Sequence, residues 1–259
     1  MLAEQNKIVK ILQTWDRAIA TTEKLIEASK QQKKALMQQL LTGKKRFPGF
    51  EGEWERGRVG DLLSGLEAGV SVNSQEVADS ESPFRILKTS CVSGEVFNPD
   101  EFKPVVDAKE ISRLRISVVA DTIIISRMNT PALVGANAYV HISCENTYLP
   151  DRLWVAKQKE ATVNMRWLGF WFSSVRTRNK LSGLATGTSG SMKNISKDAV
   201  LGLDILIPKK MEQNRIAQTI AKSENNIVKM QLALASLRKE KKALMQQLLT
   251  GKRRVRPDE

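Results

Sequence analysis

Apolar residues recur at alternating intervals of four and three positions near both ends of the chain. In the N-terminal segment these positions are Ile8, Leu12, Trp15, Ile19, Thr22, Ile26, Ser29, Lys33, Leu36 and Leu40, with a few small or polar members. In the C-terminal segment they are Ile216, Ile220, Ser223, Ile227, Met230, Leu234, Leu237, Lys241, Leu244 and Leu248. This heptad spacing predicts two helices of about 37 residues, each packed along its length against another helix.

The two heptad segments are copies of one sequence. Residues 33–44, KKALMQQLLTGK, return unchanged at 241–252, and the triplet at 4–6, Glu-Gln-Asn, returns at 212–214. Both matches are displaced by 208 positions, so one segment occurs before and again after a central region. Because the first helix ends where the central region begins and the second begins where that region ends, we expect the helices to pair antiparallel.

Glycine and proline mark the expected borders of the helices. Gly43 and Gly251 each follow Leu-Leu-Thr and predict left-handed C-terminal caps. Pro48 and Pro208 predict chain that is not helical on the two sides of the central region. The expected domains are a first spacer helix at 1–46, a central domain at 47–211 and a second spacer helix at 212–259.

The central region contains shorter apolar runs rich in β-branched residues. They predict strands at 84–88, 122–126, 138–143, 153–156 and 203–207. A helix is predicted from about 162 to 181, and Trp167 and Trp171 within it are interpreted as packing residues instead of base-stacking ones. The expected fold class is α+β, a mixed α/β domain flanked by two long, antiparallel, coiled-coil-like helices.

The chain is strongly basic, with 41 lysines and arginines against 28 aspartates and glutamates and a net charge of +13. A polyanion is the expected partner, since neutralising phosphates releases condensed counterions. The alternative is that much of this charge solvates the helices. No stretch approaches the roughly 20 apolar residues that span a membrane, and the N-terminus lacks a signal-peptide pattern. We therefore expect a cytoplasmic protein without a membrane partner, and Cys91 and Cys144 are expected to be reduced thiols.

Searches for catalytic motifs give no match. The chain has no phosphate-binding loop of the G-x-x-x-x-G-K-[ST] form, and the glycine-rich stretch at 183–190 does not fit the dinucleotide-binding fingerprint. His141 lies in a strand-like run, where a structural or surface role is expected. Asp100, Glu101 and Lys103 are the residue types of a metal-dependent nuclease, but the carboxylates are adjacent in sequence instead of coming from separate strands. We expect no catalysis by the chain itself, and no metal or cofactor.

Three loops of the central region combine basic residues with small polar ones. They are Lys88-Thr89-Ser90, Arg127-Met128-Asn129-Thr130 and the stretch from Gly187 to Asn194. Such loops bring amides, hydroxyls and cations to the phosphates and base edges of DNA. The alternative interpretation of each is an ordinary solvated surface loop.

Several motifs are similar to one protein family. GTSGSMKNIS at 187–196 is followed by LDILIP at 203–208 and EQNRI at 212–216. Trp54 precedes VGDLL at 59–63, and DTIIISR at 121–127 precedes LVG at 133–135. With these motifs the chain resembles the specificity subunit of type I restriction-modification systems over nearly its whole length. Family members alternate target-recognition domains with repeated helical spacers and typically carry two such domains. The resemblance therefore implies a half-length form, natural or truncated, with one target-recognition domain.

The resemblance implies a function and a set of partners. The central domain is expected to read one half of a split target in double-stranded DNA. The helices are expected to position it and to bind the type I methyltransferase (modification) subunits, and through them the restriction subunit. Chemistry that uses S-adenosylmethionine or ATP would reside in those subunits. Two chains could also associate through their helices as a homodimer and recognise a symmetric, interrupted target.

Within this function, we expect the loops and the basic residues to divide the contacts with DNA between them. The base-reading candidates are Ser189, Ser191, Lys193 and Asn194, followed by Arg127 and Asn129. The phosphate-contact candidates are Lys88, Arg176, Arg178 and Lys180, and Thr89 and Ser90 complete the DNA-binding set. One alternative is a coiled-coil adaptor whose basic domain binds DNA without sequence preference. A second is a nuclease or methyltransferase in its own right, against which the missing motifs argue.

Overall fold

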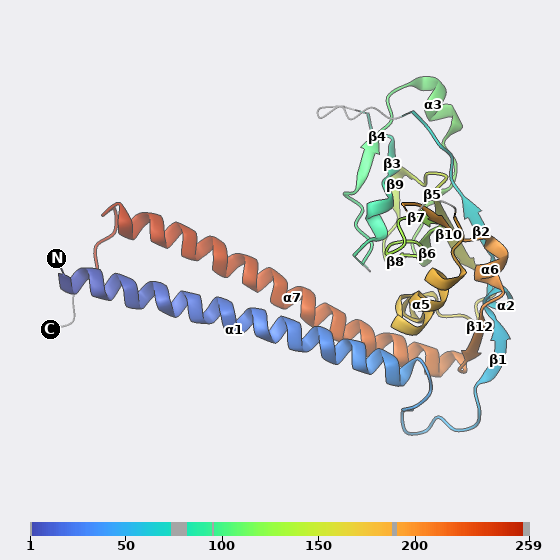
Figure 1. Cartoon of the computed structure of the whole chain (residues 1–259), viewed down its shortest axis with the longest axis horizontal. Helices are drawn as coiled ribbons and strands as arrows, with labels where there is room; N and C mark the ends of the chain where they lie inside the picture. Colours follow the sequence, from blue (N-terminus) through green and yellow to red (C-terminus); the bar gives the residue numbers. More distant parts are fainter. Residues whose placement is uncertain (1, 74–81, 95, 188–190, 256–259) are drawn as a thin grey trace. The chain divides into compact units, whose positions relative to one another are not determined.

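The chain forms two compact units in the computed structural model, which describes residues 2–73, 82–94, 96–187 and 191–255 (Figure 1). One unit, the helix pair, comprises Met1–Leu36 with Gln218–Glu259. The other, the α/β domain, comprises Met37–Ala217. The long helices α1 (Leu2–Leu40) and α7 (Lys210–Leu249) each begin in one unit and end in the other.

The two long helices run antiparallel. Ion pairs join them in opposite chain order, from Glu4–Arg254 through Asp16–Lys241 and Glu23–Arg238 to Lys33–Glu224. Every predicted heptad position is buried or half-buried, and Ile220, Ile26 and Ile227 are 0%, 5% and 7% exposed. The predicted antiparallel pairing and its seam are thus confirmed. Apolar burial at the seam stabilises the pair, because exposed ion pairs each contribute only about 0–1 kcal/mol.

The C-terminal ends of α1 and α7 have the same backbone geometry, as they have the same sequence. Gly43 and Gly251 have φ values of 70° and 71°, which confirms the predicted left-handed caps. After each cap, an amide donates back to the carbonyl of Gln39 or Gln247, at 3.2 and 3.0 Å. Sequence identity in these segments therefore extends to identical chain termination.

The α/β domain contains two four-stranded sheets and two short ribbons. The first sheet has the order β2 (Leu63–Ala68), β10 (Leu153–Gln158), β6 (Thr122–Ser126), β8 (Asn137–Val140), all antiparallel. The second has the order β4 (Phe102–Pro104), β3 (Arg85–Leu87), β9 (Cys144–Tyr148), β5 (Ser117–Val118), in which only β3 and β9 are parallel. The antiparallel ribbons are β1 (Glu55–Arg58) with β12 (Asp204–Ile207) and β7 (Met128–Asn129) with β11 (Lys193–Asn194).

Short helices complete the domain. They are α2 (Val59–Leu62), the 3-10 helix η1 (Thr89–Val92), α3 (Ala108–Arg113), α4 (Met165–Ser173), α5 (Val175–Leu184) and α6 (Lys197–Leu201). Pro48 and Pro208 lie outside all of the helices in the described residues, as predicted. None of the described helices combines the length and apolar character needed to cross a membrane.

Strand β6 lies at the centre of the core and is buried on both faces. Ile124 packs in a cluster that also contains Leu87 of β3 and Val118 of β5, so the two sheets share one core. Ile123, on the other face, lies next to Gly169 of α4. A strand covered on both sides tolerates a continuous apolar run, which explains the sequence Thr-Ile-Ile-Ile-Ser.

The helix predicted at 162–181 is two helices. Ser174 adopts an extended conformation (φ −63°, ψ 144°) between α4 and α5, and its hydroxyl accepts a hydrogen bond from the Thr177 amide. Serine offers the backbone this capping alternative to a continuous helix, and the apolar spacing does not reveal it. Trp167 and Trp171 are 0% and 8% exposed, which confirms their packing role.

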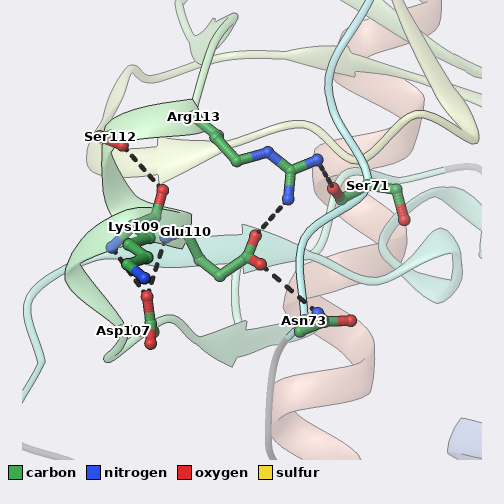
Figure 2. A network of polar contacts seen from close by, with 7 residues as sticks. All are labelled: Ser71, Asn73, Asp107, Lys109, Glu110, Ser112 and Arg113. Carbon is green, nitrogen blue, oxygen red and sulfur yellow. Dashed lines mark hydrogen bonds and ion pairs between the residues drawn. The ribbon is translucent and has the colours of Figure 1, made fainter.

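Helix α3 is attached to the segment that follows β2 by polar contacts (Figure 2). Asp107 caps the helix by accepting from the amides of the next turn, at 2.7 and 3.1 Å. The Glu110 carboxylate accepts from Arg113 at 2.8 Å and from Asn73 at 3.4 Å, and Arg113 also donates to the Ser71 carbonyl at 3.0 Å. These contacts fix the path of the chain up to Asn73.

Within the α/β domain, the first turn of α7 is held by a cluster of buried and half-buried side chains that we call the junction cluster: Arg46, Trp54, Asn164, Glu212 and Gln213. The Glu212 carboxylate accepts two hydrogen bonds from Arg46, at 2.9 and 2.8 Å, and one from the Trp54 indole at 3.0 Å. Gln213 accepts from the Asn164 amide at 2.8 Å. Glu212 and Gln213 are 1% and 2% exposed, so the domain encloses the start of α7.

The repeat contains a second copy of this ion pair. Glu4 and Arg254 stand 208 positions from Glu212 and Arg46, and they form the same two-bond contact, at 2.7 and 2.9 Å. The hydrogen bond from Arg254 lowers the pKa of Glu4 below its usual value. In the helix pair Arg254 is exposed, whereas Arg46 is largely covered. The same ion pair therefore occurs twice in one molecule, once with its arginine exposed to solvent and once with its arginine largely covered.

Candidate nucleic-acid interface

The ribbon of β7 and β11 brings two of the predicted reading loops together. Lys193 pairs with Asn129 and Asn194 pairs with Met128. On its other side, Asn194 exchanges both backbone hydrogen bonds with Thr186, at 2.8 and 2.9 Å. Strand β11 is therefore bonded along both edges. Residues 64 and 66 positions apart in the chain become direct neighbours, and the loop that begins at Gly187 is closed at its base.

Arg127 emerges where β6 ends and the ribbon begins. Its amide donates to the Arg152 carbonyl and its carbonyl accepts from the Ile195 amide, each at 3.0 Å. Its guanidinium lies 5.7 Å from the centre of the Trp154 ring. Arg127 thus has a fixed backbone and a charged side chain supported by a buried aromatic ring. The sequence interpretation included Arg127 and did not include Trp154, whose strand position gave no sign of this contact.

The two asparagines of the ribbon differ in what they bind. Asn129 uses its side chain locally, because its amide nitrogen donates to the Ser126 hydroxyl at 3.3 Å and its oxygen accepts from the Thr130 amide at 2.8 Å. The Oδ1 atom of Asn194 is buried and accepts no hydrogen bond from the described residues. A buried acceptor without a donor costs about 1–3 kcal/mol.

The Lys193 ammonium donates to the Gly187 carbonyl at 3.0 Å, across the base of the loop. Gly187 is required there, because a methyl group in its place would lie 2.5 Å from the Met192 carbonyl oxygen. Ser191 is exposed in the same loop. Ser189, the fourth candidate of this loop, lies outside the described residues.

The remaining candidates lie on other elements. Lys88, Thr89 and Ser90 are where β3 leads into η1, and the Ser90 hydroxyl donates to Glu101 at 2.6 Å. No strand pairing joins these three residues to the ribbon in the described part of the chain. Arg176 and Lys180 are exposed and one turn apart on α5.

Arg178, between them, faces the protein. Its guanidinium donates to the carbonyls of Val134 and Ala132, at 3.0 and 3.3 Å. The structure therefore separates the three basic residues of α5 into two on the surface and one bound to backbone.

Two titratable side chains of the domain, Cys91 and Tyr139, have strongly raised pKa values. Burial raises the pKa of the Cys91 thiol to about 12. Burial, followed by the Asp121 carboxylate that accepts from the hydroxyl at 2.9 Å, raises the pKa of Tyr139 to about 12. Neither group forms a nucleophile near neutral pH. His141 is exposed and its ring packs edge-on against Tyr139, so it is the surface residue that the sequence predicted.

The cysteines and the acidic residues give no further site. Cys91 and Cys144 are free, as predicted. Among the described residues, no group of histidine, cysteine, aspartate and glutamate side chains is arranged to hold a metal ion.

The fold is that of the specificity subunits of type I restriction-modification systems. The S subunit from M. genitalium superposes with a TM-score of 0.62 at 12% identity, over 95% of this chain and 60% of that one. The HsdS subunit from Thermoanaerobacter tengcongensis superposes with a TM-score of 0.53 at 17% identity, over 95% and 57%. A chain from a structure of the type I R-M system, solved to explain its complex assembly and conformational transition, superposes with a TM-score of 0.55 at 16% identity. The superposition covers 95% of this chain and 58% of that one.

The sequence points to the same proteins. The chain is 26% identical over 269 residues to the type I restriction enzyme MjaVIII specificity subunit of Methanocaldococcus jannaschii. The match covers 98% of this chain and 61% of that subunit, and no family model matches. The chain is thus a relative of type I specificity subunits, as its motifs predicted, and spans about 61% of the length of the curated relative.

Proposed function

We propose that this chain is the DNA-recognition component of a type I restriction-modification system. Specificity subunits are the non-catalytic members of such systems. Similarity to one of them along 98% of the chain supports a DNA-recognition role here. The observation that carries the finer proposal is the β7–β11 ribbon, which gathers Arg127, Asn129, Lys193 and Asn194 on one small framework. We assign to this framework the reading of one half of a split DNA target.

The chemistry of the ribbon fits base reading. Arginine and lysine donate to the acceptors of guanine in the major groove, and asparagine can both donate to and accept from adenine. Arg127 and Asn194 have their backbones fixed by paired hydrogen bonds, so their side chains start from defined positions. We place the reading of bases on these two residues and on Lys193, and phosphate contacts on the exposed Arg176 and Lys180.

The proposal is tested by co-expressing the chain with type I methyltransferase subunits and sequencing the modified genome. We expect adenine methylation at one interrupted motif, which disappears when the chain is omitted. Methylation at the same motif without the chain, or methylation without any common motif, would contradict the proposal. The partner subunits would bind and use S-adenosylmethionine and ATP. The restriction subunit would join the complex through the methyltransferase.

Replacing Arg127 by alanine is expected to relax the motif at one or two positions, because a bidentate arginine contact contributes about 1–3 kcal/mol of discrimination between bases. Replacing Arg176 by glutamine serves as the control. It is expected to weaken binding equally for all sequences and to lower the salt dependence of affinity by about one phosphate contact. Fluorescence anisotropy with matched and single-mismatch duplexes over a salt series measures both quantities. Equal behaviour of the two variants would refute the division between reading and phosphate contact.

The helix pair is the proposed binding surface for methyltransferase subunits. On α7, Val228 and Leu232 are 42% and 67% exposed, on the side of the helix that the heptad seam does not use. Exposed apolar residues at helical spacing are typical of a surface that packs against another protein.

We also propose that a second copy of the chain covers the end of the helix pair formed by Glu4 and Arg254. The two copies of the repeat differ sharply in exposure. Leu249 is 68% exposed, whereas its duplicate Leu41 in the α/β domain is 4% exposed. Met245 and its duplicate Met37 are 36% and 8% exposed. The repeated sequence therefore presents, at this end, apolar side chains that it buries in the domain. Two chains joined here would present two identical domains to a symmetric, interrupted target.

Replacing Leu249 by glutamate is expected to convert a dimer into a monomer, since the charge would have to be buried in the interface. Leu25, 54% exposed on α1, offers the matched control, and its replacement by glutamate should leave the dimer intact. Sedimentation velocity at micromolar concentration, with and without methyltransferase, provides the measurement. A wild-type chain that is monomeric in both conditions would argue against self-association.

The net charge of +13 favours one other candidate, a coiled-coil adaptor that binds DNA without sequence preference. This function predicts steep salt dependence and equal affinity for unrelated duplexes. The anisotropy series above separates the two functions, because a non-specific adaptor would bind matched and mismatched DNA with equal affinity.

A further inference from the structure

Helix α5 holds the turn that follows the β7 strand. The Arg178 guanidinium donates to the carbonyls of Val134 and Ala132, at 3.0 and 3.3 Å. One turn further along α5, the Ser182 hydroxyl donates to the Pro131 carbonyl at 3.3 Å. Backbone carbonyls at three positions of one short turn are therefore bound by two side chains of a single helix.

The turn is built to accept this contact. Gly135 adopts a φ of +71°, and a methyl group there would lie 3.0 Å from the Arg178 guanidinium and 3.0 Å from Leu181. A side chain at this position would push α5 away from the turn. The glycine thus provides both the left-handed conformation and the space that the guanidinium needs.

The turn at 130–135 also fixes the position of the β7–β11 ribbon. The Gly135 amide donates to the Ser126 carbonyl at 2.8 Å, which joins the end of the turn to the end of β6. The segment between these residues contains Arg127 and strand β7, whose partner is Lys193–Asn194 of β11. Displacement of the turn would therefore displace one strand of the ribbon and the Arg127 backbone with it.

We infer that Arg178 is a positioning residue for DNA reading: its planar guanidinium holds the turn at 130–135 and thereby sets the position of Arg127 and of the β7–β11 ribbon. The inference rests on the proposed function and changes one expectation from the sequence. Arg178 was expected to contact phosphate, and its two backbone carbonyl partners assign its guanidinium to the protein instead. Sequence preference, and not general DNA affinity, is the property that Arg178 controls.

Arginine is required at this position for a geometric reason. A guanidinium donates two hydrogen bonds in fixed, divergent directions, which suits two carbonyls two residues apart. Lysine keeps the charge but has no planar fork, so it can satisfy the phosphate role and cannot hold both carbonyls. The pair Arg178→Lys and Arg178→Gln therefore separates charge from geometry.

The experiment uses the full chain, alone and with methyltransferase subunits. A duplex motif is first selected by the wild-type chain from a library of random-sequence duplexes. Affinities for that duplex and a scrambled duplex are then measured over a salt series for Arg178→Lys, Arg178→Gln and the surface control Arg176→Gln. The thermal unfolding midpoint is measured for each variant. Hydrogen exchange is followed at the Gly135 and Ile195 amides, which tie the turn and β11 to the Ser126 and Arg127 carbonyls.

We expect both Arg178 variants to lose about tenfold or more in the ratio of selected to scrambled affinity, with the salt dependence unchanged. The amides of Gly135 and Ile195 should exchange faster in both. Arg176→Gln should keep the ratio and lose about one unit of salt dependence. If Arg178→Gln does not fold, Arg178→Lys and Ser182→Ala, which removes the bond to Pro131, give the same test.

The contrary result is also defined. Full selectivity in Arg178→Lys, together with a reduced salt dependence in Arg178→Gln, would overturn the inference and make Arg178 a phosphate contact. In that case the wild-type chain is still selective and the proposed function stands. A wild-type chain that selects no motif would overturn the proposed function itself, and the exchange rates of the variants would then report only on the turn.

Discussion

Replacing Glu212 by alanine should lower the free energy of unfolding by about 3 kcal/mol, because its buried carboxylate is the shared acceptor of a half-buried arginine and an indole. Glu212 is 1% exposed and accepts hydrogen bonds from Arg46 and from the Trp54 indole. Its removal would leave the Trp54 indole without this acceptor, and it would leave Arg46 bonded to the Gly52 carbonyl but without its anionic partner.

The repeat supplies the matched control for this experiment. Glu4 stands in the first turn of α1 as Glu212 stands in the first turn of α7, so the helix-dipole contribution is the same in both. Its partner Arg254 is exposed, and replacing Glu4 by alanine should leave stability nearly unchanged. Urea unfolding followed by circular dichroism measures both variants. A loss of stability that is equal in the two variants would show that burial of the junction cluster has no effect.

Replacing Gly69 by alanine should destabilise the domain by about 3 kcal/mol or more, because overpacking against backbone cannot be relieved by a side-chain rotation. A methyl group on Gly69 would lie 1.6 Å from the Leu149 carbonyl oxygen and 2.3 Å from its carbonyl carbon. The Val70 amide donates to that same carbonyl at 3.2 Å, and Leu149 belongs to the shared core. The strand end and the core would therefore have to separate.

Gly183 provides the comparison for Gly69. It lies in α5, and a methyl group there meets no atom within 4 Å. Its replacement by alanine should stabilise the domain by about 0.5–1 kcal/mol, since alanine loses less backbone entropy than glycine in a helix. Thermal unfolding of the two variants should move in opposite directions. A Gly69→Ala variant as stable as wild type would contradict the close approach to Leu149.

The long helices could be predicted because their signal is local and repeated. Each heptad position reports the same packing, so a few polar exceptions such as Lys33 do not hide the pattern. Strand β6 was predicted residue for residue, because burial on both faces selects an unbroken β-branched run. The break at Ser174 was missed, since the apolar spacing continues through it and only the serine cap ends α4.

Several strands carry too little apolar patterning to be found. Strand β1 reads Glu-Arg-Gly-Arg and β9 reads Cys-Glu-Asn-Thr-Tyr, and both are mostly exposed or half-buried. Their place in a sheet depends on partners far along the chain, β12 and β3. Tertiary pairing decides such strands, and composition does not encode it.

In the candidate site, too, the residue types could be predicted from the sequence, whereas their arrangement in space could not. Composition selected Lys193, Asn194, Arg127 and Asn129 as polar loop residues, and nothing in it indicated that they belong to one ribbon. The direction of Arg178 was equally hidden, because an arginine that binds carbonyls and one that faces solvent look alike in sequence. Gly135 was the available signal, since a glycine with a left-handed conformation marks a close approach of neighbouring groups.

The duplicated helices have a consequence for counting partners. Two copies of one sequence that run in opposite directions are exchanged by a half-turn about an axis perpendicular to the pair. The surroundings of the copies differ, because Met37 and Leu41 of the segment at 33–44 are buried, whereas Met245 and Leu249 of the segment at 241–252 are exposed. A single polypeptide thus has the sequence symmetry of a two-fold dimer, but a partner that recognises these apolar residues finds them exposed in the second copy and covered in the first.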